Sequence, residues 1–166
     1  MLPGALQLSP LRDFPAVEAG DVLADLVITS TRQSGYQPPS GAVLVIAQKV
    51  VSKAEGRLIH LPDVVVTAEA HALAETTQKD PRLVTLILQE SRSVIRTRPG
   101  LIITEHRTGH ILANAGIDSS NVGAKGQSES VLLWPENPDA SARDLSQRLS
   151  AAWDRPVPVL INDSLG

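Results

Sequence analysis

The chain has 166 residues, of which 42% are hydrophobic and 2% aromatic, and its 15 basic and 18 acidic residues give a net charge of −3. That length suits one core of ordinary size, while the charge balance and the scarcity of aromatic rings argue against nucleic acid as a partner. The sequence lacks cysteine, which excludes disulfides, thiolate metal sites and cysteine nucleophiles.

In chain order, the first predicted element is a helix that Asp21 caps, because apolar residues at helical spacing follow it. Pro38-Pro39-Ser40-Gly41 predicts a turn, and the short apolar run 42–47 predicts a buried strand. We expect this strand to lead into a basic, polar turn that ends at Gly56. The alanine-rich segment 67–78 predicts a second helix.

A third helix is predicted to begin at Asp80-Pro81, where an N-cap residue precedes proline, and its apolar spacing extends to Val94. Segments 101–106 and 110–114 predict two strands joined by a short turn that contains glycine. A helix capped by Asp139 and a strand over 157–161 complete the chain.

These elements predict an α+β fold, a mixed sheet with a central hairpin and several flanking helices, because the hairpin breaks the strand–helix alternation of a parallel sheet. His106 and His110 are interpreted as hairpin residues, and Trp134 and Trp153 as packing residues. The N-terminus has no signal-peptide pattern, and no apolar run approaches the roughly 20 residues that span a bilayer. We therefore expect a cytoplasmic protein with no membrane partner.

Two aspartates follow apolar runs: Asp118 comes after ILANAGI and Asp163 after VPVLIN. If the two strands are neighbours, both carboxylates emerge at one edge of a sheet, where oxygen ligands suit Mg²⁺ or Mn²⁺. Ser164 would add a hydroxyl group. The alternative is that each aspartate only caps a turn, as aspartate often does.

Lys49, Lys53 and Arg57 follow the predicted strand 42–47 closely and are candidates to hold phosphate groups. The alternative interpretation is a solvated basic turn. The sequence contains no Walker A, Gly-x-Gly-x-x-Gly or His-Glu-x-x-His pattern, so any nucleotide site must be of a less common type.

Six segments, in order and over almost the whole chain, resemble the coenzyme F420-0:L-glutamate ligase family, also called the γ-glutamyl ligase family. Their ordered combination makes the resemblance specific. The segments are Phe14-Pro15 with Gly20-Asp21-Val22-Leu23, AQKVVSKAEGR (47–57), KDPRLVTLILQES (79–91), ANAGIDSSN (113–121), LLWPENPDASA (132–142) and VLINDSLG (159–166).

The resemblance implies a ligase of coenzyme F420 biosynthesis that uses GTP to activate the terminal carboxylate of F420-0 as an acyl phosphate. The amine of L-glutamate then attacks, which gives an amide. Mg²⁺ or Mn²⁺ would reduce the repulsion between the carboxylate and the triphosphate. The family also implies a homodimer. Two alternatives stay open: a catalytically incomplete fragment that only binds nucleotide or F420 precursor, and a nucleotide-dependent amide ligase for another carboxylate.

The resemblance also implies roles for individual residues. The residues that match metal ligands, with the two aspartates at the catalytic centre, are Asp118, Asp163 and Ser164. The residues at positions that contact or line the nucleotide are Phe14, Pro15, Ala16, Val17, Gln48, Lys49, Lys53 and Asn121. Gln48 and Lys49 replace a Ser–Thr pair of the family, and backbone contacts are expected from the segment 14–17.

Members of the family continue beyond the Asp-Ser-x-Gly turn at 163–166, where this sequence stops. Residues 1–166 are therefore expected to be the N-terminal and central part of the ligase domain. The C-terminal part, which ordinarily supplies further metal and nucleotide ligands, is expected to be absent from them.

Overall fold

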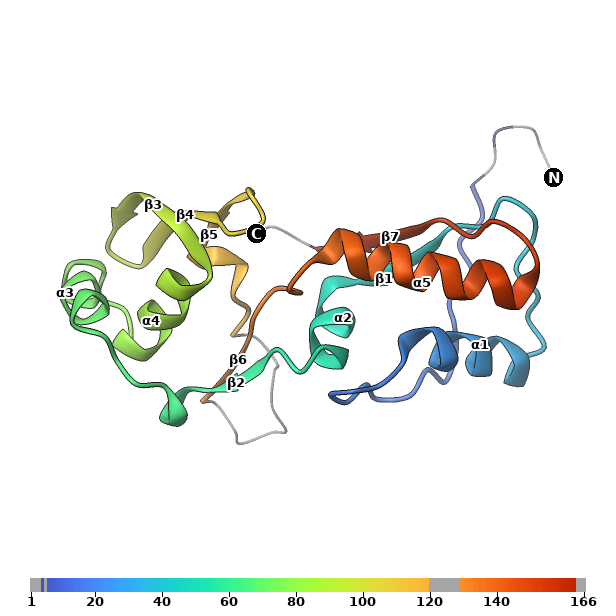
Figure 1. The fold of residues 1–166 in the computed structure, drawn as a ribbon, viewed down its shortest axis with the longest axis horizontal. Coiled ribbons are helices and arrows are strands. Elements are labelled where there is room, and N and C mark those ends of the chain that lie inside the picture. Colours follow the sequence, from blue (N-terminus) through green and yellow to red (C-terminus); the bar gives the residue numbers. More distant parts are fainter. Residues whose placement is uncertain (1–3, 5, 120–128, 164–166) are drawn as a thin grey trace.

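A computed structural model describes residues 4, 6–119 and 129–163 of the chain. In these residues, five α-helices and seven β-strands form two lobes that lie side by side, and the predicted α+β class is confirmed (Figure 1). The strands are divided among three small sheets, one of three strands and two of two strands. No helix in the described residues is long and apolar enough to cross a membrane.

The first lobe consists of a parallel pair of strands with helices packed against one face. Its elements are α1 (Leu23–Gln33), β1 (Leu44–Ala47), α2 (Gln48–Ala54), α5 (Pro138–Trp153) and β7 (Val159–Asn162). β1 pairs with β7 in a register that places Ala47 opposite Asn162. The two strands therefore end together, and this end points toward the second lobe (Figure 1).

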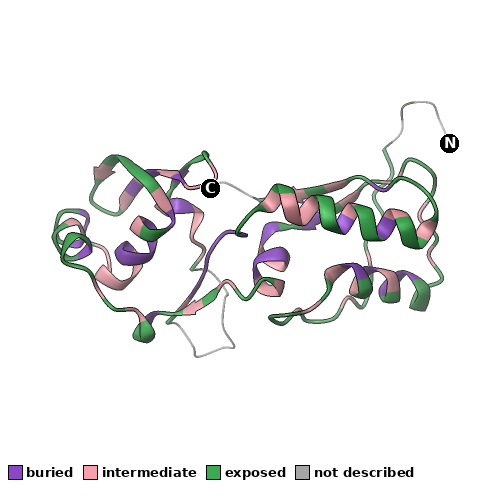
Figure 2. Cartoon of the chain, viewed as in Figure 1, coloured by how far each residue is buried: buried purple, intermediate pink, exposed green. Residues whose placement is uncertain are grey.

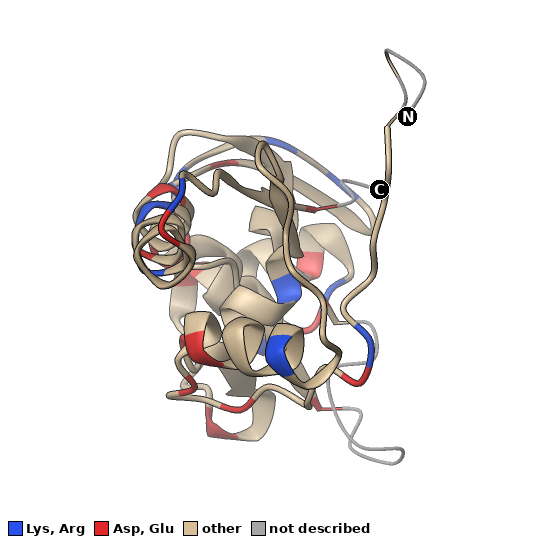
Figure 3. Cartoon of the chain, turned by 90° about the vertical axis from the view of Figure 1, so that its right-hand side faces the viewer, with Lys and Arg blue, Asp and Glu red and all other residues tan. Residues whose placement is uncertain are grey.

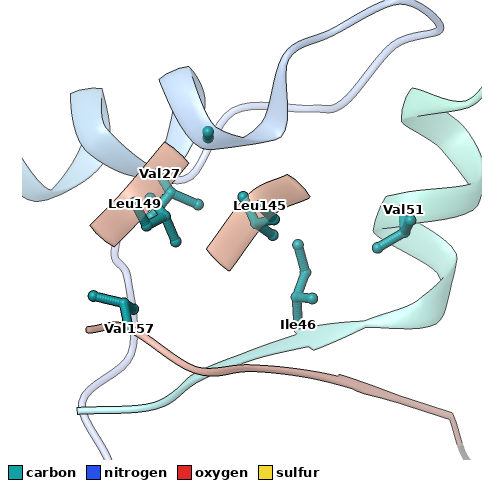
Figure 4. Packing of buried hydrophobic residues seen from close by; sticks show 7 residues of the cluster. Val27, Ile46, Val51, Leu145, Leu149 and Val157 are labelled. Carbon is teal, nitrogen blue, oxygen red and sulfur yellow. The ribbon is translucent and has the colours of Figure 1, made fainter. Parts of the chain in front are cut away.

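Side chains from α1, α2 and α5 meet the inner face of β1 and the approach to β7 to form the core of this lobe (Figure 4). Ile46 is buried in β1 while its neighbours Val45 and Ala47 are exposed, as the alternation of side chains along a strand requires. The labelled core residues are Val27, Ile46, Val51, Leu145, Leu149 and Val157.

The second lobe packs two helices against an antiparallel sheet of order β3-β4-β5. Its elements are α3 (Ala68–Thr77), α4 (Pro81–Gln89), β3 (Ser91–Arg98), β4 (Leu101–His106) and β5 (Ile111–Ala113). The predicted cap of α4 is confirmed, because Asp80 Oδ1 accepts a hydrogen bond of 2.8 Å from the backbone N–H of Arg82. The predicted hairpin is confirmed as the β4–β5 pair.

A short antiparallel ladder joins the lobes: β2 (Leu58–His60) pairs with β6 (Ser130–Leu132). The segment that follows β6 runs between the lobes and is buried there (Figure 2). Leu132, the last residue of β6, is 0% exposed, and the two residues after it, Leu133 and Trp134, are 4% and 8% exposed. This segment is the central support of the site described below.

The structure contradicts one predicted turn and the predicted end of one helix. The turn expected between the strand 42–47 and Gly56 contains the helix α2. The third predicted helix ends at Gln89 instead of reaching Val94, because the chain enters β3 at Ser91.

Two predicted caps are also wrong. Val22 stands at the N-cap of α1, and the Asp21 carboxylate instead accepts a hydrogen bond of 2.8 Å from the backbone N–H of Glu18. Asn137 caps α5 in place of Asp139, with its side-chain oxygen accepting from the backbone N–H of Ala140 at 3.0 Å. Each cap lies within two residues of the predicted one.

Candidate functional site

The carboxyl ends of β1 and β7 meet at one edge of their sheet. Ala47 lies opposite Asn162, so β1 and β7 end at the same edge of the sheet. Gln48 follows β1 at this edge, and Asp163 follows β7. Lys49 is the second residue of α2, which begins directly after β1. A lysine expected to bind phosphate and an aspartate expected to bind metal therefore share this edge.

Asp118 contacts this edge from the second lobe. Its Oδ2 lies 2.6 Å from Lys49 Nζ, and the two side chains are 27% and 36% exposed. The backbone of Asp118 forms an isolated antiparallel bridge with Leu132, with N–H···O distances of 3.0 and 2.8 Å. The structure thus joins the lysine and aspartate candidates in an ion pair held against the segment after β6.

Asp163 is held by the same segment through a side chain. The indole Nε1 of Trp134 donates a hydrogen bond of 3.2 Å to Asp163 Oδ2. β5 and β7 belong to different sheets, so the two aspartates do not follow neighbouring strands. The link between them is one short segment of chain, in which Leu132 contacts Asp118 and Trp134 contacts Asp163.

The turn that precedes Asp118 has an uncommon backbone. Asn114, Ala115 and Gly116 all lie in the left-handed region, with φ angles of 51°, 54° and 69°. A non-glycine residue there costs roughly 1–2 kcal/mol, and such strain concentrates at functional sites. At Gly116 a Cβ atom would lie 2.5 Å from Trp134 Nε1, so glycine lets the indole ring pack directly against this turn.

Two further predicted nucleotide contacts lie on α2. Lys53 is half-buried and follows Lys49 by four residues, so both lysines lie on one face of the helix. Gln48 is buried, and its Nε2 donates to Ser52 Oγ at 2.6 Å and to the carbonyl of Leu133 at 3.5 Å. Gln48 therefore anchors α2 to the segment after β6, and its contact with a nucleotide stays a prediction.

The predicted nucleotide-lining segment, Phe14 to Val17, precedes α1. Phe14 packs against the core of the first lobe, and Pro15 and Ala16 are exposed. Shortly after this segment, the backbone N–H of Gly20 donates to the carbonyl of Ala54 at 2.8 Å, which ties it to the end of α2. Asn121 and Ser164 lie outside the described residues, and their roles stay predictions.

The two aspartates offer hard carboxylate oxygens, which suit Mg²⁺ or Mn²⁺. No group of three or more His, Asp or Glu side chains in the described part of the chain is arranged to hold a metal ion. A donor set of two carboxylates would suit an ion such as Mg²⁺, which binds through one or two carboxylates and keeps water and phosphate oxygens as its other ligands. Basic and acidic residues are interspersed along the ribbon (Figure 3). The charged groups of this site are therefore not part of a larger surface of one sign.

The sequence profile of the F420-0:γ-glutamyl ligase family matches residues 13–166. The chain belongs to this family.

Two of its relatives in the γ-glutamyl ligase family are coenzyme F420:L-glutamate ligases. The ligase of Methanopyrus kandleri is 43% identical to this chain over 161 residues, and that of Methanothermobacter thermautotrophicus is 40% identical over 161 residues. The matches cover 97% of this chain but 60% and 62% of these two relatives. The corresponding ligase of Archaeoglobus fulgidus is 34% identical, again over 97% of this chain and 61% of the relative.

Sequence reasoning missed a buried charge network in this member of the γ-glutamyl ligase family. Glu90 is 5% exposed, and its Oε2 lies 2.6 Å from Arg57, 3.1 Å from Arg107 and 3.6 Å from His106 Nε2. Burial by itself raises the pKa of Glu90, but His106 and the two arginines outweigh it and lower the pKa. Arg57 Nε also donates to the carbonyl of Trp134 at 2.9 Å, so the network fixes the backbone of the residue that holds Asp163.

The guanidinium of Arg57 is thus engaged inside the protein, and its contact with a phosphate group stays a prediction. A cavity of about 400 Å³ lies elsewhere, between α1, α2 and α5, and none of the predicted site residues lines it. The candidate site therefore rests on the side-chain pairs at the edge of the β1–β7 sheet.

Proposed function

We propose that this chain carries the phosphate and metal site of a GTP-dependent ligase that joins L-glutamate to coenzyme F420-0. The observation that supports the proposal is the Lys49–Asp118 ion pair at the sheet edge where Asp163 emerges, in a chain that the γ-glutamyl ligase family matches over residues 13–166. The named relatives are coenzyme F420:L-glutamate ligases, which supports F420 biosynthesis as the setting.

In the proposed reaction, a carboxylate oxygen of F420-0 attacks the γ-phosphorus of GTP and the bond to GDP breaks, which gives an acyl phosphate. The glutamate amine attacks the acyl carbon, phosphate leaves, and the nitrogen loses a proton as the amide forms. The ammonium groups of Lys49 and Lys53 attract the phosphate oxygens. Asp118 and Asp163 are the residues that would hold a divalent cation, which would supply neutralisation of charge on the transferring phosphoryl group.

The experiment is incubation of the purified chain with F420-0, L-glutamate, GTP and Mn²⁺, followed by mass spectrometry. We expect a GTP-dependent mass gain of one glutamate. Asp118→Asn should lower the rate by about 100-fold or more, because loss of a residue that only supports a metal ligand already costs about 10–100-fold. Asp144→Asn is the matched control, since Asp144 pairs on the helix surface with Arg148 at 2.8 Å.

The other outcomes separate the alternatives. Binding of GTP and Mn²⁺ without product would indicate a chain that only binds ligands. A clear preference for a different carboxylate acceptor would replace the proposed substrate. Unchanged turnover in Asp118→Asn would remove Asp118 from the site.

We also propose that the chain forms a homodimer. Light scattering coupled to size-exclusion chromatography would then give twice the 17.7 kDa mass of the chain. A mass of one chain across the working concentration range would contradict this.

A further inference from the structure

Trp134 is more than a packing residue, because its one polar group is directed at a proposed metal ligand. The side chain is 8% exposed, and a buried indole N–H ordinarily needs an acceptor. Here the acceptor is Asp163 Oδ2, at 3.2 Å. Asp163 itself is exposed at the end of β7, and Oδ2 is the carboxylate oxygen that the described residues engage.

The Trp134 ring is held on several sides by the second lobe. Its centroid lies 5.5 Å from that of His106 and 5.4 Å from that of His110, both in tilted or edge-on geometry. The backbone of Gly116 leaves no room for a Cβ atom against the ring. The carbonyl of Trp134 accepts the hydrogen bond from Arg57. The direction of the indole N–H is therefore fixed independently of Asp163.

We propose that Trp134 is a positioning residue that orients the Asp163 carboxylate toward the cation. This inference rests on the proposed function. With Oδ2 engaged by the indole, Oδ1 would be the oxygen of Asp163 that is available to a cation. An oriented carboxylate binds a metal better than a freely rotating one, because less conformational freedom is lost on binding.

The chemistry of the donor supports this role. The indole of Trp134 is a neutral donor, so its hydrogen bond adds no positive charge beside Asp163 and leaves the negative charge of that carboxylate available. A cation needs that negative charge. A hydrogen bond to an exposed carboxylate adds little net stability because it replaces one to water, so its larger effect is on the geometry of the oxygen atoms.

The chain contains two tryptophans, so its ¹⁵N–¹H spectrum contains two indole signals, which Trp153→Phe assigns. Trp153 lies at the far end of α5, and the 16 residues of that helix span about 24 Å. We expect Asp163→Asn to shift the Trp134 signal and leave the Trp153 signal in place. Mn²⁺ should broaden the Trp134 signal at concentrations that leave the Trp153 signal sharp.

The Mn²⁺ affinity of the variants gives the second measurement. Trp134→Phe should weaken Mn²⁺ binding by about 10–100-fold, while Trp153→Phe, the matched control, should stay within about 2-fold of wild type. If Trp134→Phe fails to fold, the Asp163→Asn spectrum decides the matter, since it keeps both rings in place.

An unmoved Trp134 signal in Asp163→Asn, or wild-type Mn²⁺ affinity in folded Trp134→Phe, would overturn the inference and leave the proposed function standing. A wild-type chain that binds no Mn²⁺ would overturn both.

Discussion

Replacing Glu90 by glutamine removes the negative charge of a buried charge network and keeps the side-chain volume. The side chain of Glu90 is 7% exposed and that of its closest partner, Arg57, is 16% exposed, so neither charge is well solvated. Removing one member of a buried ion pair leaves the other uncompensated, which costs about 3–5 kcal/mol. We expect Glu90→Gln to lower the free energy of unfolding by that amount at pH 7.

An exposed ion pair in the same lobe provides the control. Glu105 Oε1 lies 3.5 Å from Arg92 Nη1, with the two side chains 38% and 59% exposed. Glu105→Gln should therefore cost less than about 1 kcal/mol. Urea unfolding followed by circular dichroism measures both variants. A cost for Glu90→Gln no larger than that for Glu105→Gln would refute the reasoning.

The pH dependence of the same variant gives a second check. The pKa of Glu90 is lowered in the folded chain, so its carboxylate contributes stability that is fully present above the unfolded pKa of about 4.3. That contribution falls as the pH drops through the folded pKa. The difference between wild type and Glu90→Gln should thus be constant near neutral pH and become smaller below about pH 4. A difference that persists or grows on acidification would contradict this.

Two further predictions concern the backbone. Gly116→Ala should destabilise the chain more than Gly100→Ala in urea unfolding: both have positive φ, at a cost of about 1–2 kcal/mol, but a Cβ at Gly116 would also displace the Trp134 ring, whereas Gly100 has open space. Equal costs would show that the ring moves freely. Asp80→Ala should cost about 1 kcal/mol through loss of the α4 cap, and Asp80→Asn, which keeps an acceptor, should cost less. Equal losses in the two Asp80 variants would remove the capping explanation.

The elements that could be predicted from the sequence are those with local signals. Asp80-Pro81 marks the start of α4 through an N-cap and a proline, which act within one turn of the helix. The hairpin strands carry a turn between two apolar runs, and β4 alternates between buried and half-buried residues. In each case the neighbouring residues determine the structure.

The elements that sequence reasoning missed depend on distant contacts. α2 has seven residues, too few to show a clear helical period, and it forms with Val51 in the core and Gln48 hydrogen-bonded to Leu133. β3 follows α4 without a proline or glycine between them, and most of its residues are exposed, so it lacks a strand-like apolar pattern. Pairing with β4 defines it.

The sequence predicted which residues belong to the site but not how their side chains contact one another. Lys49 and Asp118 were candidates for different reasons, phosphate and metal binding, and their ion pair arises because α2 and the turn before Asp118 meet the same segment. Trp134 had a usable signal, since a buried tryptophan needs an acceptor for its N–H. The sequence does not say which acceptor, because Asp163 follows a strand of the first lobe and is 29 residues away along the chain.

The two lobes have separate cores: no buried residue of the cluster around Leu149 belongs to the clusters around Ile87 and Leu86 in the described chain. Three residues on each side form the ladder that joins them. Asp118 follows the last strand of the second lobe, and Asp163 follows the last strand of the first. Partial unfolding of either lobe therefore changes the position of one carboxylate relative to the other. On heating, loss of the proposed Mn²⁺ binding should therefore precede the loss of helical signal, and its midpoint temperature would measure the weaker lobe rather than the whole chain.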